Sequence, residues 1–355
     1  MIQGRNKMRH YLKLFRLFSF FILVFQVSGN NYNTLASERI RWKLQITAAG
    51  TENHVKQLID QIKTISEGKI KFRLYKVNSL VSGLVLHTAI GEGQIEAGFS
   101  IPGYLASKIP AVVLFGGVPF GPRYAEHYAW MQHGGGQQLK DRIYGEHGLI
   151  SLECGVEPPE SGGWFNKRHE KVIDLRGIKM RTFGLGGKVL KKFGVSPTSL
   201  GPYDIVPSVK NGVIDATEFS TPQWDHWLGL QKIFKYYYFP SWHQPYAVHE
   251  LVINKQKWDE LGKAGRLIIM NSCNSLILVM MGKSNALQPQ AMRDIKQEGV
   301  KFVRWRDSEL KKLRQAWHEV AEEESEKDPL FAEVYQSYKS FRDQYKIWGD
   351  RAYLN

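Results

Sequence analysis

An arginine and a glutamate stand at the ends of two short apolar segments in the middle of the chain. Arg181 lies in IKMRTF, directly before the glycine-rich turn GLGG, and Glu218 lies at the end of VIDATEF. Both segments have the length and apolar character of β-strands. Because ligand crevices in open α/β sheets form outside the carboxyl ends of the strands, the two side chains could converge on one polar ligand.

The chemistry of these two side chains suits a carboxylate ligand. The guanidinium of Arg181 presents a rigid fork that matches a carboxylate with two parallel hydrogen bonds. Glu218 could accept a hydrogen bond from a ligand hydroxyl, or bind a cation together with backbone carbonyls near Phe219 and Glu160. The alternatives are a surface or interlobe salt bridge for Arg181, and an ion pair between Arg181 and Glu218 themselves.

The segment PSWHQP supplies further candidates for a binding pocket. Its residues Trp242, His243 and Gln244 are expected to contact a ligand, although a lone histidine is more often a satisfied loop residue. The GLGG turn lacks both GxGxxG and the Walker lysine, which disfavours phosphate binding. No HExxH, GxSxG or CxxC pattern gives positive evidence of catalysis. A hydrolase that uses Glu160 and Glu218 as an acid/base pair is the alternative to a binding protein.

The composition is that of a folded protein with room for two domains. The 355 residues are 43% hydrophobic and 23% charged, with a formal net charge of +14. Five of the 48 basic residues precede Ser37, and without them the net charge is near +9. Because the sequence has neither a basic run with interleaved aromatics nor a zinc-knuckle spacing, we expect no nucleic-acid binding.

The N-terminus has the pattern of an export signal. Basic residues precede an apolar stretch, Leu17 to Val27, that is too short for a typical membrane-spanning helix. We therefore predict that residues 1–37 form a signal peptide, cleaved after Gly29 or Ser37, and that the mature protein is periplasmic. An uncleaved N-terminal anchor is the alternative.

Two cysteines occur in the chain. Cys154 and Cys273 could form one disulfide, but each stands alone in an apolar context. Solitary cysteines in such surroundings commonly behave as small buried apolar residues. The sequence therefore favours two free buried cysteines.

The order of elements predicts a mostly parallel α/β architecture with two related halves. Arg41–Gly50 reads as a strand, the following amphipathic helix ends near Gly68, and IKFRLYKV reads as the next strand. The segments GQIEAG (Gly93–Gly98) and GVIDAT (Gly212–Thr217) share the order glycine, any residue, isoleucine, acid, alanine or small residue. This short repeat predicts two lobes of similar local topology.

The predicted lobes each combine two stretches of the chain. Residues 38–155 and about 247–285 are assigned to lobe I, and residues 156–246 and about 286–355 to lobe II with the C-terminal helices. The strand LISLECGVE and the Pro/Gly-rich loop that follows it read as the crossing between lobes, a natural hinge. Within lobe I, the apolar run from Ala111 to Phe115 reads as a strand that ends at two glycines.

Many ordered motifs together resemble one family. The chain is similar to the DctP-type extracytoplasmic solute-binding subunits of tripartite ATP-independent periplasmic (TRAP) transporters, in a branch with 2-oxo acid binders and mannitol/chloroaromatic-type members. The resemblance covers about residues 40–353. It rests on VPFGP, CGVEPPESGGWF, LRGIKMRTFGLGGKVLKKFGV, GVIDATEFSTP, YYYFPSWHQP, ELVINKQKW and FRDQYKIWGD.

The resemblance implies a fold, a function and a set of partners. The implied fold is α/β, a two-lobed, type II-like periplasmic-binding-protein fold with hinge strands and long C-terminal helices. The implied protein is not an enzyme: it captures a small carboxylate of the 2-oxo or hydroxy acid type and delivers it to a TRAP membrane permease. A swapped C-terminal helix in the family, together with the apolar stripe Phe331–Phe341, points to a possible homodimer.

The resemblance also implies roles for individual residues. Arg181 would clamp the ligand carboxylate, and Tyr104 is the pocket candidate in lobe I. In related 2-oxo acid binders a metal ion joins the ligand, and the matching ligands here are Glu160, Glu218 and the backbone carbonyl of Phe219, around sodium or calcium. This chain departs from the pattern, because Glu160 replaces a glutamine and Phe219 a tryptophan. Two carboxylates against one arginine leave the site near −1, so a monoanionic ligand needs a cation or a protonated carboxyl.

Overall fold

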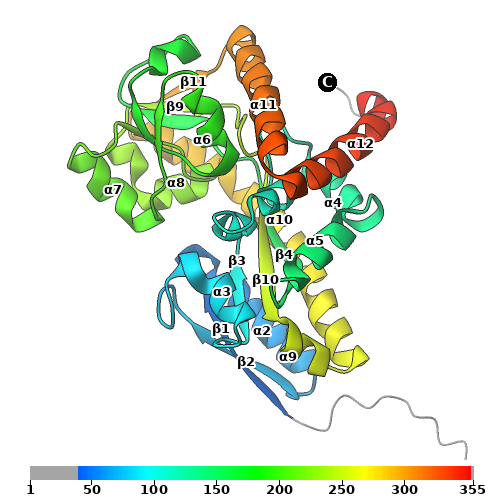
Figure 1. Cartoon of the computed structure of the whole chain (residues 1–355). Coiled ribbons are helices and arrows are strands. Elements are labelled where there is room, and N and C mark those ends of the chain that lie inside the picture. Colours follow the sequence, from blue (N-terminus) through cyan, green and yellow to red (C-terminus); the bar gives the residue numbers. More distant parts are fainter. Residues whose placement is uncertain (1–38, 353–355) are drawn as a thin grey trace, which may run out of the picture.

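The computed structural model describes residues 39–352. The predicted signal peptide and both of its cleavage sites therefore lie outside the described residues. Two mixed β-sheets, each flanked by helices, lie at opposite ends of the molecule. Long C-terminal helices pack beside them (Figure 1).

The first sheet has five strands and contains the β-α-β unit at the start of the described chain. Strands β2, β1 and β3 run parallel to one another, and β10 runs antiparallel to both of its neighbours, β3 and β4. The order across the sheet is β2 (Ile70–Tyr75), β1 (Ile40–Ile46), β3 (Ala97–Ser100), β10 (Ala247–Asn254) and β4 (Leu149–Glu157). The helices of this region are α2 (Glu52–Ile65), α3 (Leu86–Gly91), α4 (Tyr124–His133), α5 (Gly136–Gly145) and α9 (Lys255–Glu260).

The second sheet has six short strands and carries the arginine and glutamate singled out in the sequence. β6 runs parallel to both of its neighbours, and β5 runs antiparallel to both of its own. The order is β11 (Lys301–Arg304), β9 (Tyr236–Phe239), β5 (Gly163–Phe165), β8 (Ala216–Thr217), β6 (Lys179–Arg181) and β7 (Ser196–Thr198). Its helices are α6 (Gly184–Lys191), α7 (Pro202–Lys210) and α8 (Pro222–Leu228).

Three connections join the two sheets. β4 leads from the first sheet to β5 in the second, and β9 leads back to β10 in the first. The third connection is α10 (Lys263–Gln297), which packs against β4 and α2 at one end of the molecule and α8 at the other (Figure 1). By length and composition α10 could cross a membrane. Its residues Ile269 and Leu276 are buried in the protein core, whereas Leu278 is exposed.

The two C-terminal helices cover one flank of the molecule. α11 (Asp307–Lys327) packs against α6 and α12, and α12 (Pro329–Ala352) packs against α4 and α5. Three residues of the predicted apolar stripe, Phe331, Val334 and Tyr338, are buried within this chain. The stripe therefore serves the core of the chain itself, whereas Ile347 and Trp348 near the end of α12 are exposed.

The expectation of two free cysteines is wrong. Cys154 on β4 and Cys273 on α10 form a disulfide, with Cα atoms 4.2 Å apart. The two residues are 119 positions apart in sequence, and only the packing of α10 on β4 brings them together. The apolar context that favoured buried cysteines was real, since both side chains are buried, but it carried no information on their proximity.

The strand expected at Ala111–Phe115 is also wrong. The segment forms a 3-10 helix, η4 (Pro110–Phe115), that packs against α12 and α5. Pro110 stands at its first position, where the fixed φ of proline favours a helical start and the missing N–H costs nothing. The run is apolar throughout because it is buried among helices, an environment that hydrophobicity alone cannot distinguish from a buried strand.

Candidate functional site

A cavity of about 370 Å³ lies where loops from both sheets meet. One wall comes from the loops after β1, β2 and β3, and the opposite wall from the loops after β6, β7 and β8. Every one of these strands contributes its carboxyl end, as expected for a ligand crevice in α/β sheets. The volume falls in the range of about 300–1,000 Å³ that is typical of small-molecule sites.

Arg181 ends β6 and is almost fully buried at this cavity. β6 and β8 are parallel, with Arg181 paired to Thr217, so Glu218 follows directly at the same edge of the sheet. Nη1 of Arg181 donates to the backbone carbonyl of Glu218 at 2.7 Å and lies 3.1 Å from its Oε1. Nε donates to the carbonyl of Leu200 at 3.3 Å, and the guanidinium lies over the ring of Phe219. Within residues 39–352 these contacts hold the guanidinium in one orientation and leave Nη2 for a ligand.

Glu218 is buried and ionised beside Arg181. Burial opposes its ionisation, but Arg181, His243 and the backbone N–H of Phe183 together hold the pKa of Glu218 below its usual range. The N–H of Phe183 donates to Oε1 at 2.6 Å. The ion pair that the sequence offered as an alternative to ligand binding is therefore present, and it lies in the wall of the cavity.

His243 lies between two buried carboxylates. Its Nε2 is 3.4 Å from Oε2 of Glu160 and 3.6 Å from Oε2 of Glu218. Burial disfavours the imidazolium, but the two carboxylates outweigh it and raise the pKa of His243 to about 9. Burial and the neighbouring Glu218 raise the pKa of Glu160 to about 7, with His243 opposing the shift. The protonated histidine thus balances part of the negative charge at this end of the cavity.

These residues fit a cation if it replaces the proton on His243. One potential ligand atom from each of Glu160, Glu218 and His243 lies within 4.8 Å of the others, and all three side chains are buried. Nε2 of His243 is buried without a hydrogen-bond partner among residues 39–352, so the cluster is not closed by internal hydrogen bonds. Carboxylate and carbonyl oxygens are the ligands that sodium and calcium prefer.

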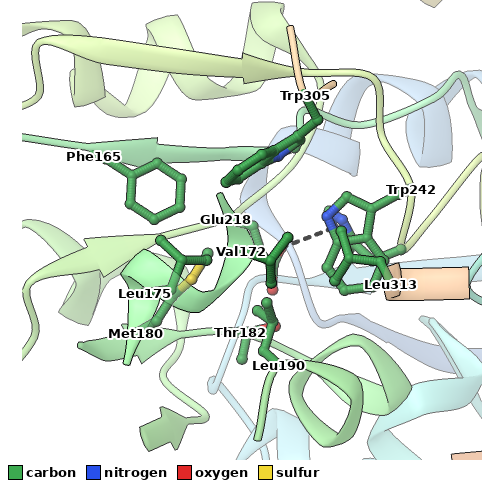
Figure 2. A pocket seen from close by; sticks show the side chains of 12 residues that line it. Phe165, Val172, Leu175, Met180, Thr182, Leu190, Glu218, Trp242, Trp305 and Leu313 are labelled. Atoms are coloured by element: carbon green, nitrogen blue, oxygen red, sulfur yellow. Dashed lines mark ion pairs between the residues drawn. The ribbon is translucent and has the colours of Figure 1, made fainter. Parts of the chain in front are cut away.

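The predicted site residues divide into two groups. Glu160, Arg181, Glu218, Phe219, Tyr104 and Gln244 line the cavity. Tyr104, in η3 (Pro102–Leu105), comes from the opposite wall and meets Phe183 edge to face. Trp242 lies instead at a separate apolar cavity of about 10 Å³ behind Glu218, close to the smallest space that holds one water (Figure 2). His243 reaches the two carboxylates from that side.

Asp225 is a supporting residue that the sequence did not reveal. It is fully buried in α8 and accepts hydrogen bonds from Trp164 and Tyr237, each at 2.7 Å. It also accepts from the Ser161 hydroxyl and the Ser220 N–H, the residues next to Glu160 and Phe219. Asp225 therefore fixes the two loops that carry the candidate cation ligands. Its signal in the sequence was slight, a single acid in the first turn of a short helix.

Two glycines allow the walls of the cavity to touch. A Cβ at Gly50 would lie 2.4 Å from Cη2 of Trp224, and a Cβ at Gly103 would lie 2.4 Å from Cε1 of Phe183. Gly50 and Gly103 lie in the loops after β1 and β3 of the first sheet, and Phe183 and Trp224 follow β6 and β8 of the second. The two sides of the molecule are therefore in direct contact around the cavity.

The geometry disfavours the hydrolase alternative. Glycosidases place their two carboxyl groups about 5–5.5 Å apart or further, with the scissile bond between them. Here the imidazole of His243 occupies the space between Glu160 and Glu218, 3.4 Å from one carboxylate and 3.6 Å from the other, where the scissile bond would have to lie. The pair has the geometry of a charge cluster that a cation or proton holds together.

Comparison with known proteins agrees with this architecture. A monocarboxylate 2-oxoacid-binding periplasmic protein of Nostoc sp. is 30% identical over 313 residues, which are 87% of this chain and 86% of the relative. A TRAP transporter solute-binding protein of Bordetella bronchiseptica, a mixed-occupancy dimer with copurified calcium and picolinate, superposes with a TM-score of 0.85 at 28% identity, covering 89% of this chain and 95% of its own. A TRAP periplasmic solute-binding protein of Pseudoalteromonas atlantica with bound sodium and pyruvate gives a TM-score of 0.84 at 28% identity, with coverage of 89% and 97%.

A family model also matches most of the chain. Residues 48–328 match the family described as bacterial extracellular solute-binding protein, family 7. This confirms the predicted two-lobed α/β fold class and the prediction that the protein binds and transports rather than catalyses. The chain belongs to the DctP family of bacterial extracellular solute-binding proteins.

Proposed function

We propose that this protein captures a small carboxylate of the 2-oxo or hydroxy acid type and delivers it to a TRAP membrane permease. The observation that carries the proposal is the buried guanidinium of Arg181, fixed by Glu218 and Leu200 at the wall of the cavity. A buried arginine of this kind matches a carboxylate through charge-assisted hydrogen bonds. The relatives support the ligand class, since they bind 2-oxo acids, pyruvate and picolinate.

A cation completes the site in this proposal. Glu160, Glu218 and the backbone carbonyl of Phe219 would hold sodium or calcium next to the ligand carboxylate. The extra negative charge of Glu160, where related binders have glutamine, favours calcium because calcium affinity rises with the number of carboxylate ligands. The bound ion would replace the proton of His243 as the positive charge that offsets the two carboxylates, and would allow a monoanion to approach Arg181.

Lobe closure would bury the ligand. The proposed lobes are residues 38–155 with about 247–285, and residues 156–246 with about 286–355. The chain between β4 and β5 and the chain between β9 and β10 would act as hinges, since both cross between the sheets. Contacts at Gly50 and Gly103 support this reading, because they join opposite walls beside the cavity.

We further propose that the mature protein is periplasmic after removal of the N-terminal signal. The disulfide between Cys154 and Cys273 supports an oxidising compartment. A homodimer through the C-terminal helix is supported by Ile347 and Trp348, which are exposed on α12. Sedimentation of the purified protein at several concentrations would measure its oligomeric state.

Thermal unfolding with pyruvate, with and without calcium, tests the proposed ligand class. At one hundred times its dissociation constant a ligand should stabilise the native state by about 2.7 kcal/mol. The Arg181→Ala variant should lose this stabilisation, because the carboxylate loses its charge-assisted donors. Chelation of calcium should reduce the stabilisation by pyruvate in the wild-type protein.

The control is Arg304→Ala. Arg304 is exposed and pairs with the exposed Asp307, so its loss should leave binding unchanged. If Arg181→Ala binds pyruvate as the wild type does, Arg181 is not the anchor. If pyruvate and its 2-oxo and 2-hydroxy homologues all fail to stabilise the wild type in either condition, the proposed ligand class is wrong.

A further inference from the structure

The end of β4 places a further acidic residue, Glu157, in the wall of the cavity. Glu157 is the last residue of β4 and pairs with Ala247 of β10. Two residues earlier in β4, Gly155 pairs with His249. Residues that face each other in an antiparallel pair share one face of the sheet. Glu157, Ala247 and His249 accordingly all line the cavity.

Glu157 is buried without a full set of partners. Its side chain is 3% exposed, and Oε2 has no hydrogen-bond partner among residues 39–352. The indole N–H of Trp224 donates to Oε1 over a long 3.4 Å. Burial raises the pKa of Glu157, and the nearby Ser284 hydroxyl and Trp224 indole offset only part of that shift. A buried carboxyl group in this state gains free energy from any donor that reaches it.

No basic side chain forms an ion pair with Glu157 in the described part of the chain. Arg181 is engaged by Glu218, and His243 stands between Glu160 and Glu218. His249, the diagonal neighbour of Glu157 across the strand pair, is held neutral because burial and His54 lower its pKa to about 4. The ion pairs at the cavity thus join Arg181, His243, Glu160 and Glu218, and Glu157 takes no part in them.

The separation of Glu157 from the Glu160 carboxylate cluster suits one small molecule. Glu157 and Glu160 are three residues apart, so their Cα atoms are separated by about 10 Å at most. Ala247, the strand partner of Glu157, is small and lines the cavity beside it, whereas Gly155 packs against Met280 of α10. A ligand whose carboxylate lies at Arg181 can therefore present its other end to Glu157.

We propose that the natural ligand carries a hydrogen-bond donor, a hydroxyl or amino group, at the end remote from its carboxylate, and that Glu157 accepts from this donor. This inference rests on the proposed function and narrows its ligand class. Glu157 then serves as a specificity residue, which favours ω-hydroxy and ω-amino acids of the 2-oxo or 2-hydroxy type over their unsubstituted homologues.

Calorimetric titration with matched pairs of acids tests the inference. Pyruvate and longer straight-chain 2-oxo acids are each compared with their ω-hydroxy, ω-amino and ω-carboxy derivatives, in the presence of calcium. At the chain length that spans the cavity, we expect the ω-hydroxy or ω-amino acid to bind the wild type about tenfold more tightly than its plain homologue. In Glu157→Leu this preference should vanish, while affinity for the plain acid stays within about twofold.

The control and the outcomes separate this inference from the proposed function. Asp204→Asn removes an exposed carboxylate that also lines the cavity, and it should keep the preference for the donor-bearing acid. If plain acids bind but the ω-hydroxy and ω-amino derivatives gain nothing, or if the ω-carboxy derivatives bind best, the inference is overturned and the proposed function stands. An equal loss of affinity for plain and donor-bearing acids in a folded Glu157→Leu protein would also overturn the inference. If no acid binds the wild type, the proposed function itself has failed.

Discussion

Adding a single methyl group at Gly103 should hold the cavity open. The Cβ of an alanine there would lie 2.4 Å from Cε1 of Phe183, whereas carbon atoms pack best at about 3.5–4.0 Å. The shortfall exceeds 1 Å, so either the ring of Phe183 moves or the two walls separate. Overpacking of this kind typically costs about 1–3 kcal/mol, and under the proposed lobe closure the cost would fall on the closed form alone.

The expected loss of affinity follows from that cost. Since each 1.4 kcal/mol is about a factor of ten, Gly103→Ala should weaken binding of pyruvate roughly five- to hundredfold. The free energy of unfolding of the ligand-free protein should stay the same or rise slightly, because the open form accepts the methyl group and alanine restricts the unfolded chain. Calorimetric titration and urea denaturation of the same preparation measure the two quantities.

A control glycine and a second variant make the test specific. Gly282 lies in α10 with no atom within 4 Å of its added Cβ, so Gly282→Ala should bind as the wild type does. In a double-mutant cycle, Phe183→Ala should make the Gly103→Ala change nearly neutral, since the clashing ring is gone. Wild-type affinity in Gly103→Ala, or a loss of stability without ligand that matches the loss of affinity, would refute the reasoning.

Two further predictions concern stability. Burial opposes ionisation of Glu250, but Lys140 at 3.2 Å and its other partners hold the pKa of Glu250 at about 2. The contribution of Glu250 to the free energy of unfolding is therefore fully present above its unfolded pKa of about 4.3 and is lost as the pH falls towards 2. Glu250→Gln should therefore cost about 3–5 kcal/mol at neutral pH, because Lys140 stays buried and unpaired, and the difference should shrink in acid; a difference independent of pH would contradict this. The disulfide between Cys154 and Cys273 closes a loop of about 119 residues, so its removal in a Cys154→Ser/Cys273→Ser variant should cost about 4–5 kcal/mol by chain entropy. Equal midpoints of urea unfolding for that variant and the oxidised wild type would rule out this contribution.

The meeting of Arg181 and Glu218 could be predicted from local patterns. Each ends a strand with parallel character, and parallel strands in one sheet bring their carboxyl ends to the same edge. The observed pairing of Arg181 with Thr217 is the register that this expectation requires. The sequence could not decide between an ion pair and a ligand site, and the structure has both features in one place.

Contacts that join distant parts of the chain were not predictable in the same way. His243 was a plausible pocket donor, but its position between Glu160 and Glu218 depends on the path of the loop that joins β9 to β10. Trp242 was expected in the pocket and instead packs behind it. Adjacent residues of one loop face different environments, and sequence spacing does not reveal which.

The two-lobed α/β class, the strand ends that bear Arg181 and Glu218, and membership of the family could be predicted from the amino-acid sequence, because periodicity, turn residues and ordered motifs are local properties. Three features depend on how the chain packs: the disulfide between Cys154 and Cys273, the contact of Gly103 with Phe183, and the burial of Glu157 in the cavity wall without an ion-pair partner within residues 39–352. Each of these joins residues from separate elements. Their energies depend on burial and distance, which arise only when the chain is packed.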